Sequence, residues 1–215
     1  MHRPSVFYSI LEPIYPFLVQ QFADDYGLNR GIAVDIGTGP GFLGTELAKI
    51  TNMTVCFVDL NEEALQSAKE RFMVSETDNE ALFVRADVKA LPFEDGFADF
   101  VMSRGSIWFW EEPEKGLSEV YRILKPGGVA VIGGGLGRYV PDSMRRRIVA
   151  ANRDRLIRSG ETRPCFKDFS RMIEDALLEK AGVDSFRMIS EGEEGDSGKW
   201  VEIHKNGDGK RGGLS

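Results

Sequence analysis

The feature that most constrains this chain is a regular alternation of short apolar runs with segments of helical periodicity between residues 31 and 134. Five runs, at 31–36, 53–59, 81–86, 98–103 and 128–134, are short and bounded by Gly, Pro, Asn or Asp. This alternation is typical of βαβ units and predicts a parallel sheet covered by helices on both faces. Two further runs, at 183–190 and 199–205, predict an antiparallel hairpin. We therefore expect an α/β three-layer sandwich with a seven-stranded, mostly parallel sheet whose last strand is antiparallel.

Length and charge narrow the class of protein. The 215 residues suit one large domain, and a hydrophobic share of 42% with 24 glycines allows a buried core. A net charge of -7 argues against nonspecific binding of nucleic acid. No run approaches the roughly 18 apolar residues of a membrane span, and the start lacks the layout of a secretory signal, so we expect a cytoplasmic protein. Two cysteines and two histidines predict no metal site.

The other segments predict how the chain is organised. Residues 1–30 are expected to form a helical preamble, broken at Pro13 and Pro16, that covers the active site. Residues 31–205 are expected to form the main domain, in which Asn61 caps one helix and Pro113 opens another that ends in a turn at 125–128. After the fifth strand we expect an arginine-rich helix at about 142–158 and another helix at 168–181. Residues 206–215 are predicted to be a disordered tail.

The most informative segment is a glycine-rich loop after the first predicted strand. Open α/β sheets bind ligands at this position, where glycines let backbone N–H groups and a helix N-terminus approach an anionic group. A dinucleotide site that begins directly after the strand would need its third glycine at residue 42, which is Phe42. A later match, G-x-G-x-x-G from residue 39, leaves Asp35 unexplained. The pattern D-x-G-x-G-x-G accounts for Asp35, Gly37, Gly39 and Gly41 together.

This last pattern resembles motif I of class I S-adenosylmethionine-dependent methyltransferases, and the resemblance extends over residues 31–135. Asp59 ends the second predicted strand, where a carboxylate can accept both hydroxyls of a ribose, although an NAD site would use the same residue. Asp87 follows the third strand, where the family uses an acid to accept from the adenine amino group. The resemblance implies a Rossmann-like fold and a cofactor site made by Asp35, Gly37, Thr38, Gly39, Gly41, Asp59, Leu60, Asp87, Val88 and Ser103.

The acceptor is expected to be a small molecule that binds past the fourth strand, in the aromatic stretch 103–110 that faces the preamble. Candidate residues for its pocket are Tyr8, Tyr15, Arg104 and Trp108, and packing into the core is the alternative explanation for the aromatic residues here. Methyl transfer from a sulfonium depends mainly on positioning, and a base is needed only when the acceptor carries a proton. No constellation in the sequence fixes such a base, so we assign no catalytic residue.

An arginine-rich segment follows the fifth strand. Between residues 138 and 163 the local charge is +5 on an otherwise acidic chain. This contrast indicates either a cap at about 136–165 that attracts an anionic acceptor or docks to an acidic surface, or a solvated helical face. Two alternatives to a methyltransferase stay open from the sequence: an NAD-dependent oxidoreductase, and a silent module that binds S-adenosylmethionine as a partner or sensor. The oligomeric state is not predicted.

Overall fold

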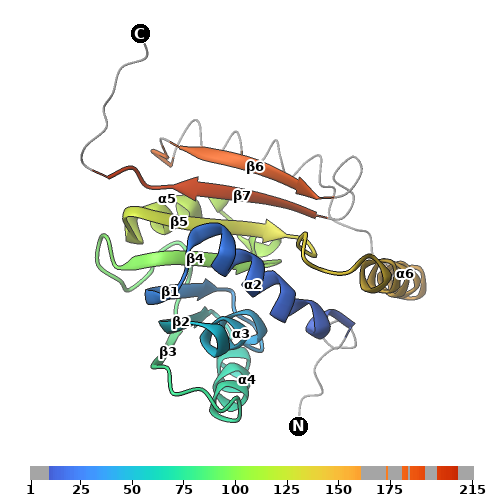
Figure 1. Cartoon of the computed structure of the whole chain (residues 1–215). Coiled ribbons are helices and arrows are strands. Elements are labelled where there is room, and N and C mark those ends of the chain that lie inside the picture. The colour runs from blue at the N-terminus through green and yellow to red at the C-terminus, as the bar shows by residue number, and fades with distance from the viewer. Residues whose placement is uncertain (1–9, 161–172, 174–180, 184, 192–197, 208–215) are drawn as a thin grey trace.

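The structure is a computed structural model that describes residues 10–160, 173, 181–183, 185–191 and 198–207. In chain order (Figure 1) the elements are η1 (Glu12–Ile14), α2 (Tyr15–Tyr26), β1 (Arg30–Ile36), α3 (Phe42–Ile50), β2 (Asn52–Asp59), α4 (Glu62–Met73), β3 (Ala81–Arg85), β4 (Ala98–Arg104), η2 (Ile107–Phe109), α5 (Pro113–Ile123), β5 (Leu124–Gly134), α6 (Asp142–Ser159), β6 (Phe186–Glu191) and β7 (Gly198–His204). The predicted helix at 168–181 falls almost entirely outside the described residues.

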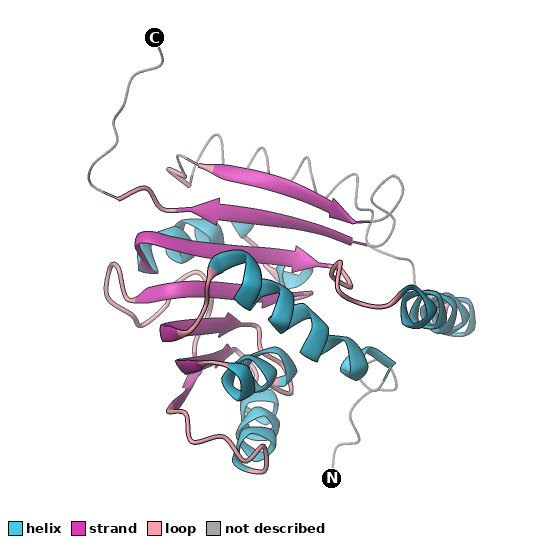
Figure 2. Ribbon diagram, in the orientation of Figure 1, coloured by secondary structure: helices cyan, strands magenta, loops and turns pink. Residues whose placement is uncertain are grey.

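The seven strands form one sheet in the order β3-β2-β1-β4-β5-β7-β6. Strands β1 to β5 pair in parallel, whereas β7 lies between β5 and β6 and runs antiparallel to both. This confirms the predicted seven-stranded, mostly parallel sheet with an antiparallel last strand. The sixth strand begins at residue 186, three residues later than predicted. Because β1 to β5 all point the same way, their carboxyl ends meet at one edge of the sheet (Figure 2).

The core lies in two layers because neighbouring residues of a strand face opposite sides of the sheet. On β4, Phe100 and Met102 pack with the buried residues of α2 and α3, where the rings of Phe100 and Phe22 are 5.8 Å apart. Val101, between them, packs on the other face with Leu117 of α5. The three-layer sandwich predicted from the sequence is therefore confirmed, and it holds the carboxyl ends of the strands rigidly in place. None of the helices in the described part of the chain is long and apolar enough to cross a membrane.

The preamble differs from its prediction at one proline. Pro13 lies in the short 3-10 turn η1, but Pro16 lies in the first turn of α2 and causes no break. In the first turn of a helix the backbone N–H groups have no partner within the helix, so proline loses no hydrogen bond there. The fixed φ of proline also suits the helix. Gly27, with a φ of 62°, ends α2 in the left-handed conformation. A continuous α2 can therefore pack along the sheet and bring Tyr15, at its start, to the carboxyl edge.

The predicted turn at 125–128 belongs instead to β5. Leu124 pairs with Ala98 and Val129 pairs with Phe100, so the residues between them form a bulge within the strand. The backbone of this bulge is held by the residue after β7, because the N–H of Gly127 donates to the carbonyl of Lys205 over 2.7 Å. The turn prediction missed this pairing because it depends on a residue some 80 positions later in the chain.

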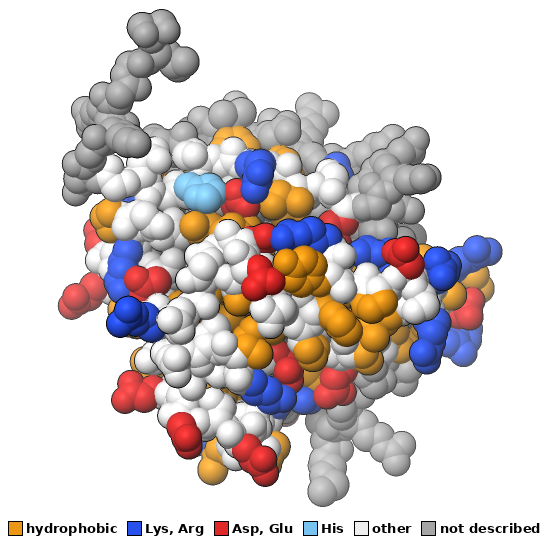
Figure 3. All heavy atoms as spheres, in the orientation of Figure 1, with side chains coloured by type: hydrophobic (Ala, Val, Ile, Leu, Met, Phe, Trp, Pro, Cys, Tyr) orange, Lys and Arg blue, Asp and Glu red, His pale blue; other side chains and the backbone are white. Residues whose placement is uncertain are grey.

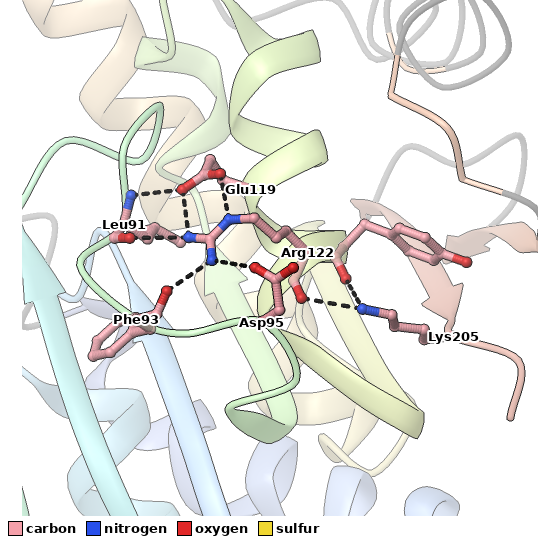
Figure 4. Close-up of polar contacts among 7 residues, drawn as sticks. Leu91, Phe93, Asp95, Glu119, Arg122 and Lys205 are labelled. Atoms are coloured by element: carbon pink, nitrogen blue, oxygen red, sulfur yellow. Dashed lines mark hydrogen bonds and ion pairs between the residues drawn. The ribbon is translucent and has the colours of Figure 1, made fainter. Parts of the chain in front are cut away.

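One polar cluster fastens the loop between β3 and β4 to α5 (Figure 4). The guanidinium of Arg122 donates to both carboxylate oxygens of Glu119, to Asp95 and to the carbonyls of Leu91 and Phe93. The same Glu119 accepts from the N–H of Leu91 over 2.8 Å. The donation by Arg122 keeps the pKa of Glu119 below its ordinary value. Asp95 is exposed, but the other groups are partly or fully withdrawn from water, so their mutual bonds are the main way in which they are satisfied.

We expect Arg122→Ala to lower the free energy of unfolding by about 1–3 kcal/mol, because it leaves a carboxylate and two carbonyls without their donor. The control is Arg85→Ala, which removes an ion pair with Glu62 whose two side chains are mostly exposed. That change is expected to cost about 0–1 kcal/mol. Urea unfolding of the two variants measures the difference. Equal losses would show that the Arg122 cluster contributes no more than a surface ion pair.

Candidate functional site

A cavity of about 500 Å³ opens at the carboxyl edge of the sheet. Its wall is built from the loops that follow β1, β2, β3 and β4, together with the start of α2. The residues that line it are Tyr15, Asp35, Ile36, Gly37, Thr38, Gly39, Pro40, Phe42, Leu43, Val58, Asp59, Leu60, Ala86, Asp87, Val88, Lys89, Arg104, Gly105, Ser106, Phe109, Trp110 and Glu111. A volume of this order suits a small-molecule ligand.

The glycine-rich loop forms the floor of this cavity. Gly37, Gly39 and Gly41 have φ values of 64°, 54° and 76°, which residues other than glycine rarely adopt. A Cβ at Gly37 would lie 2.2 Å from the Cβ of Ser106, and one at Gly41 would lie 2.7 Å from the Cβ of Ala68. Gly37 therefore keeps the floor close to the loop after β4, and Gly41 lets the start of α3 pack against α4.

Asp35 is buried beneath the loop and ties it to α3. Its Oδ2 accepts from the hydroxyl of Thr38 over 2.6 Å and from the N–H of Gly44 over 3.0 Å. Burial, with a smaller contribution from the nearby Asp59, raises the pKa of Asp35 to about 6 against the lowering effect of these two donors. The loop conformation is therefore coupled to a carboxyl group that titrates near neutral pH.

Two more carboxylates line the wall formed by the loops after β2 and β3. Asp59 accepts from the N–H of Gly39 over 2.8 Å and from that of Asn61 over 2.9 Å, so it links the glycine-rich loop to the start of α4. Asp87 accepts from the N–H of Lys89 over 2.9 Å. Each carboxylate offers about four acceptor positions. Both can therefore accept further hydrogen bonds from a ligand that donates hydroxyl or amino groups.

The end of the cavity at β4 has the opposite charge. Arg104 donates from Nε to the carbonyl of Gly135 over 3.0 Å and from Nη1 to the hydroxyl of Tyr15 over 3.4 Å. The ring of Tyr15 stacks on that of Phe42, with centroids 5.1 Å apart, and Arg71 covers the far side of Phe42. The cavity thus has Asp59 and Asp87 at its β2 and β3 side, where Lys89 pairs with Asp87 and with Glu111, and the guanidinium of Arg104 at its β4 side.

Comparison with known proteins decides which family has this arrangement. The family model described as "Methyltransferase domain" matches residues 34–132. A crystal structure from Methanococcus maripaludis, assigned as an S-adenosyl-L-methionine-dependent methyltransferase, has 31% sequence identity, covers 92% of this chain and 88% of that chain, and superposes with a TM-score of 0.76. The chain belongs to the S-adenosylmethionine-dependent methyltransferase family.

Curated relatives of this methyltransferase act in quinone chemistry, judged by their names. The 2-methyl-6-phytyl-1,4-hydroquinone methyltransferase of Arabidopsis thaliana is 36% identical over 100 residues, which are 46% of this chain and 28% of the relative. The ubiquinone/menaquinone biosynthesis C-methyltransferase UbiE of Yersinia pestis is 28% identical over 135 residues, which are 59% of this chain and 54% of the relative. The chain therefore matches only a part of these relatives.

The cavity of this methyltransferase brings together ten of the residues named from the sequence. They are Asp35, Gly37, Thr38, Gly39, Asp59, Leu60, Asp87 and Val88 among the cofactor candidates, and Tyr15 and Arg104 among the acceptor candidates. Tyr8 lies outside the described residues. Three candidates do not line the cavity: Gly41, which packs on Ala68, Ser103, which is fully buried, and Trp108, which packs against the core.

The aromatic stretch after β4 shows why Trp108 is not in the cavity wall. The 3-10 turn η2 rotates its side chains so that Ile107 is buried, whereas Phe109 is 84% exposed at the cavity. Trp110 also lines the cavity, and its Nε1 donates to the hydroxyl of Ser106 over 3.2 Å. The sequence predicts one aromatic stretch over 103–110, because no periodic signal distinguishes a single 3-10 turn from a loop.

The arginine-rich segment lies beyond the carboxyl end of β5. Figure 3 shows Lys and Arg side chains gathered over α6 at the right of the view, and none of the residues 136–160 lines the cavity. Two of its arginines are bound nearby: Arg138 pairs with Asp25 of α2, and Arg145 donates to the carbonyl of Gly137. The proposed role as a cap that attracts an acceptor stays a prediction, and residues 161–165 fall outside the described residues.

We expect Asp35 to make the stability of this methyltransferase depend on pH. The unfolded chain loses the Asp35 proton near pH 3.8, whereas the folded protein keeps it up to about pH 6. The contribution of Asp35 is therefore fully present at low pH and is lost as pH rises through about 6, by about 3 kcal/mol in total. Urea unfolding between pH 4 and 7 should show this loss in the wild type but not in Asp35→Asn. A constant difference between the two proteins would contradict it.

Proposed function

We propose that this chain binds S-adenosylmethionine in the cavity and transfers its methyl group to a small-molecule acceptor. One observation carries the proposal: the glycine-rich loop, Asp59 and Asp87 face the same cavity as Tyr15 and Arg104. This arrangement offers hydrogen-bond acceptors for a nucleoside at one end of the cavity and room for a second molecule at the other end. The chain's membership of the methyltransferase family makes methyl transfer the reaction that this geometry supports best.

The residues present fit this cofactor. Asp59 would accept from the two ribose hydroxyls, and Asp87 would accept from the adenine amino group. Leu60, whose side chain is 62% exposed at the cavity, and Val88 would cover the two faces of the adenine ring. Gly37 has no Cβ, so the floor of the cavity can lie close against Ser106 of the loop after β4 and keep the shape of the site. When bound, S-adenosylmethionine supplies a methyl group on a positively charged sulfur.

The geometry disfavours a dinucleotide. A pyrophosphate site directly after β1 would need a glycine at residue 42 for close packing of the helix on the strand. Phe42 stands there instead, and its ring is held between Tyr15 and Arg71.

Transfer of a tritiated methyl group from S-adenosylmethionine to a panel of phenols tests the proposal. The panel includes methylhydroquinone, because curated relatives are named for hydroquinone or quinone methylation. We expect a labelled organic product that depends on the protein and decreases in Asp59→Ala. Binding of the cofactor without transfer to any member of the panel would support the silent binding module. Absence of cofactor binding would contradict the proposal altogether.

A further inference from the structure

Arg104 is a cation that the fold holds in place without neutralising it. Its guanidinium is partly buried, lies over the ring of Tyr15 at 5.4 Å from the centroid, and donates to the carbonyl of Gly135 and the hydroxyl of Tyr15. Within the described part of the chain, no carboxylate lies within ion-pair distance of Arg104. A partly desolvated guanidinium at a cavity wall, with N–H groups that have no protein acceptor among the described residues, is a binding group for an oxyanion.

The position of Arg104 is fixed by hydrogen bonds around the carboxylate of Glu191. Glu191, at the end of β6, accepts from the N–H groups of Leu136 and Gly137 over 2.8 and 2.9 Å, and from Nε1 of Trp200 over 2.6 Å. These bonds hold the connection after β5, which presents the carbonyl of Gly135 to Arg104. The guanidinium is therefore preorganised rather than free to move with solvent.

The groups that hold Arg104 come from outside the stretch that the family model matches. The family model matches residues 34–132, whereas Tyr15, Gly135 and Glu191 all lie beyond it. The shared stretch contains the glycine-rich loop, Asp59 and Asp87, which are the groups suited to the nucleoside. Contacts from outside residues 34–132 are those expected to distinguish the acceptor of this chain.

We propose that Arg104 and the hydroxyl of Tyr15 bind an acidic oxygen of the acceptor, and that this acceptor is a phenol that reacts as its phenolate. The inference rests on the proposed function and names the substrate class of the same site. Because the Tyr15 oxygen accepts from Arg104, its own proton can be donated to the acceptor oxygen. The two donors would converge on one atom.

The walls near this pair favour a flat ring over an aliphatic anion. Phe109 is 84% exposed at the cavity, and Trp110, Phe42 and Tyr15 also line it. Aromatic faces stack on another ring and gain contact over its whole area. A phenol presents such a ring together with one oxygen that becomes anionic. That combination matches an aromatic wall beside a single guanidinium.

The pair explains how the acceptor is activated without a base. The phenolic O–H releases its proton to water, and the oxyanion left behind is stabilised by Arg104 and Tyr15. An electron pair of the phenolate, at oxygen or at a ring carbon, then forms the bond to the methyl carbon. The bond between that carbon and sulfur breaks, its electrons stay on sulfur, and a neutral thioether leaves. After attack at carbon, the ring proton is lost to water and aromaticity is restored.

The test uses 4-nitrophenol, whose ionised form absorbs visible light, as a probe in the presence of S-adenosylhomocysteine. We expect the bound probe to ionise at a lower pH than the free probe, because the guanidinium favours the phenolate. Arg104→Gln should abolish this shift and weaken binding of the phenolate about tenfold or more, in line with loss of one charge-assisted hydrogen bond. Arg104→Lys should keep part of the shift, and Tyr15→Phe should reduce it.

The control is Arg138→Gln, which removes a more exposed arginine, paired with Asp25, that does not line the cavity. It should leave the pH at which the bound probe ionises unchanged. The inference is overturned if the probe does not bind, if it ionises equally in wild type and Arg104→Gln, or if Arg104→Gln weakens only S-adenosylhomocysteine. The last result would assign Arg104 to the cofactor carboxylate. Failure of the proposed function is distinguishable, because then S-adenosylhomocysteine does not bind to the wild type.

Discussion

Gly37→Ala is expected to lower the affinity for S-adenosylhomocysteine by about 100-fold or more and to destabilise the fold. The new Cβ would lie 2.2 Å from the Cβ of Ser106, so the cavity floor and the loop after β4 must separate. The left-handed backbone adds about 1–2 kcal/mol and overpacking adds about 1–3 kcal/mol to the loss of stability. Calorimetric titration and urea unfolding measure the two effects.

Two variants separate the clash from the backbone strain. Gly27→Ala introduces a side chain at a φ of 62° with nothing within 4 Å, so it should cost stability only modestly and leave cofactor affinity unchanged. Adding Ser106→Gly to Gly37→Ala removes the clashing atom and should recover part of the affinity. If Gly37→Ala behaves like Gly27→Ala, the close approach of the floor to Ser106 has no role in binding.

Asp59→Ala is expected to lose about 100-fold or more in cofactor affinity, and Asp87→Ala about tenfold. Asp59 would give up two charge-assisted hydrogen bonds to ribose, and Asp87 one to adenine, each contributing about 1.5–3 kcal/mol. Asp59 also holds the N–H of Gly39, so its loss loosens the floor as well. Titration of both variants with S-adenosylhomocysteine measures the two losses.

The matched control for these aspartates is Asp24→Ala, which removes a carboxylate on α2 that does not line the cavity. It should bind S-adenosylhomocysteine like the wild type. Small and equal losses in Asp59→Ala and Asp87→Ala, with intact folding, would mean that both residues only shape the starts of their loops. A larger loss in Asp87→Ala would reverse the assignment of ribose and adenine.

The fold was predictable because each strand has a local signal, a short apolar run bounded by Gly, Pro, Asn or Asp. The run at 53–59 becomes β2, and Asn61 caps α4 by accepting from the N–H groups of Glu63 and Ala64, as its residue type predicts. The bulge at 125–128 was not predictable from local signals, because residues distant in sequence hold it. Pro16 shows a subtler error: its effect depends on whether it falls in the first turn of a helix or inside it.

The candidate site was predictable where each residue follows directly from a strand end. Asp35, Asp59 and Asp87 meet at one cavity because parallel strands place their carboxyl ends together. Gly41 is the last glycine of the motif and was predicted to bind the cofactor, but its lack of a side chain allows α3 to pack on α4. The stack of Arg104 on Tyr15 joins residues far apart in sequence, so only the folded chain shows that the two named candidates form one unit.

Calorimetric titration of the wild-type protein with S-adenosylhomocysteine and, separately, with NAD tests the central claim most directly. That claim is that the cavity beside Asp59 and Asp87 is an S-adenosylmethionine site. We predict saturable binding of S-adenosylhomocysteine at one site per chain, strongly weakened in Asp59→Ala, and no binding of NAD. Saturable binding of NAD without any response to S-adenosylhomocysteine would contradict the claim.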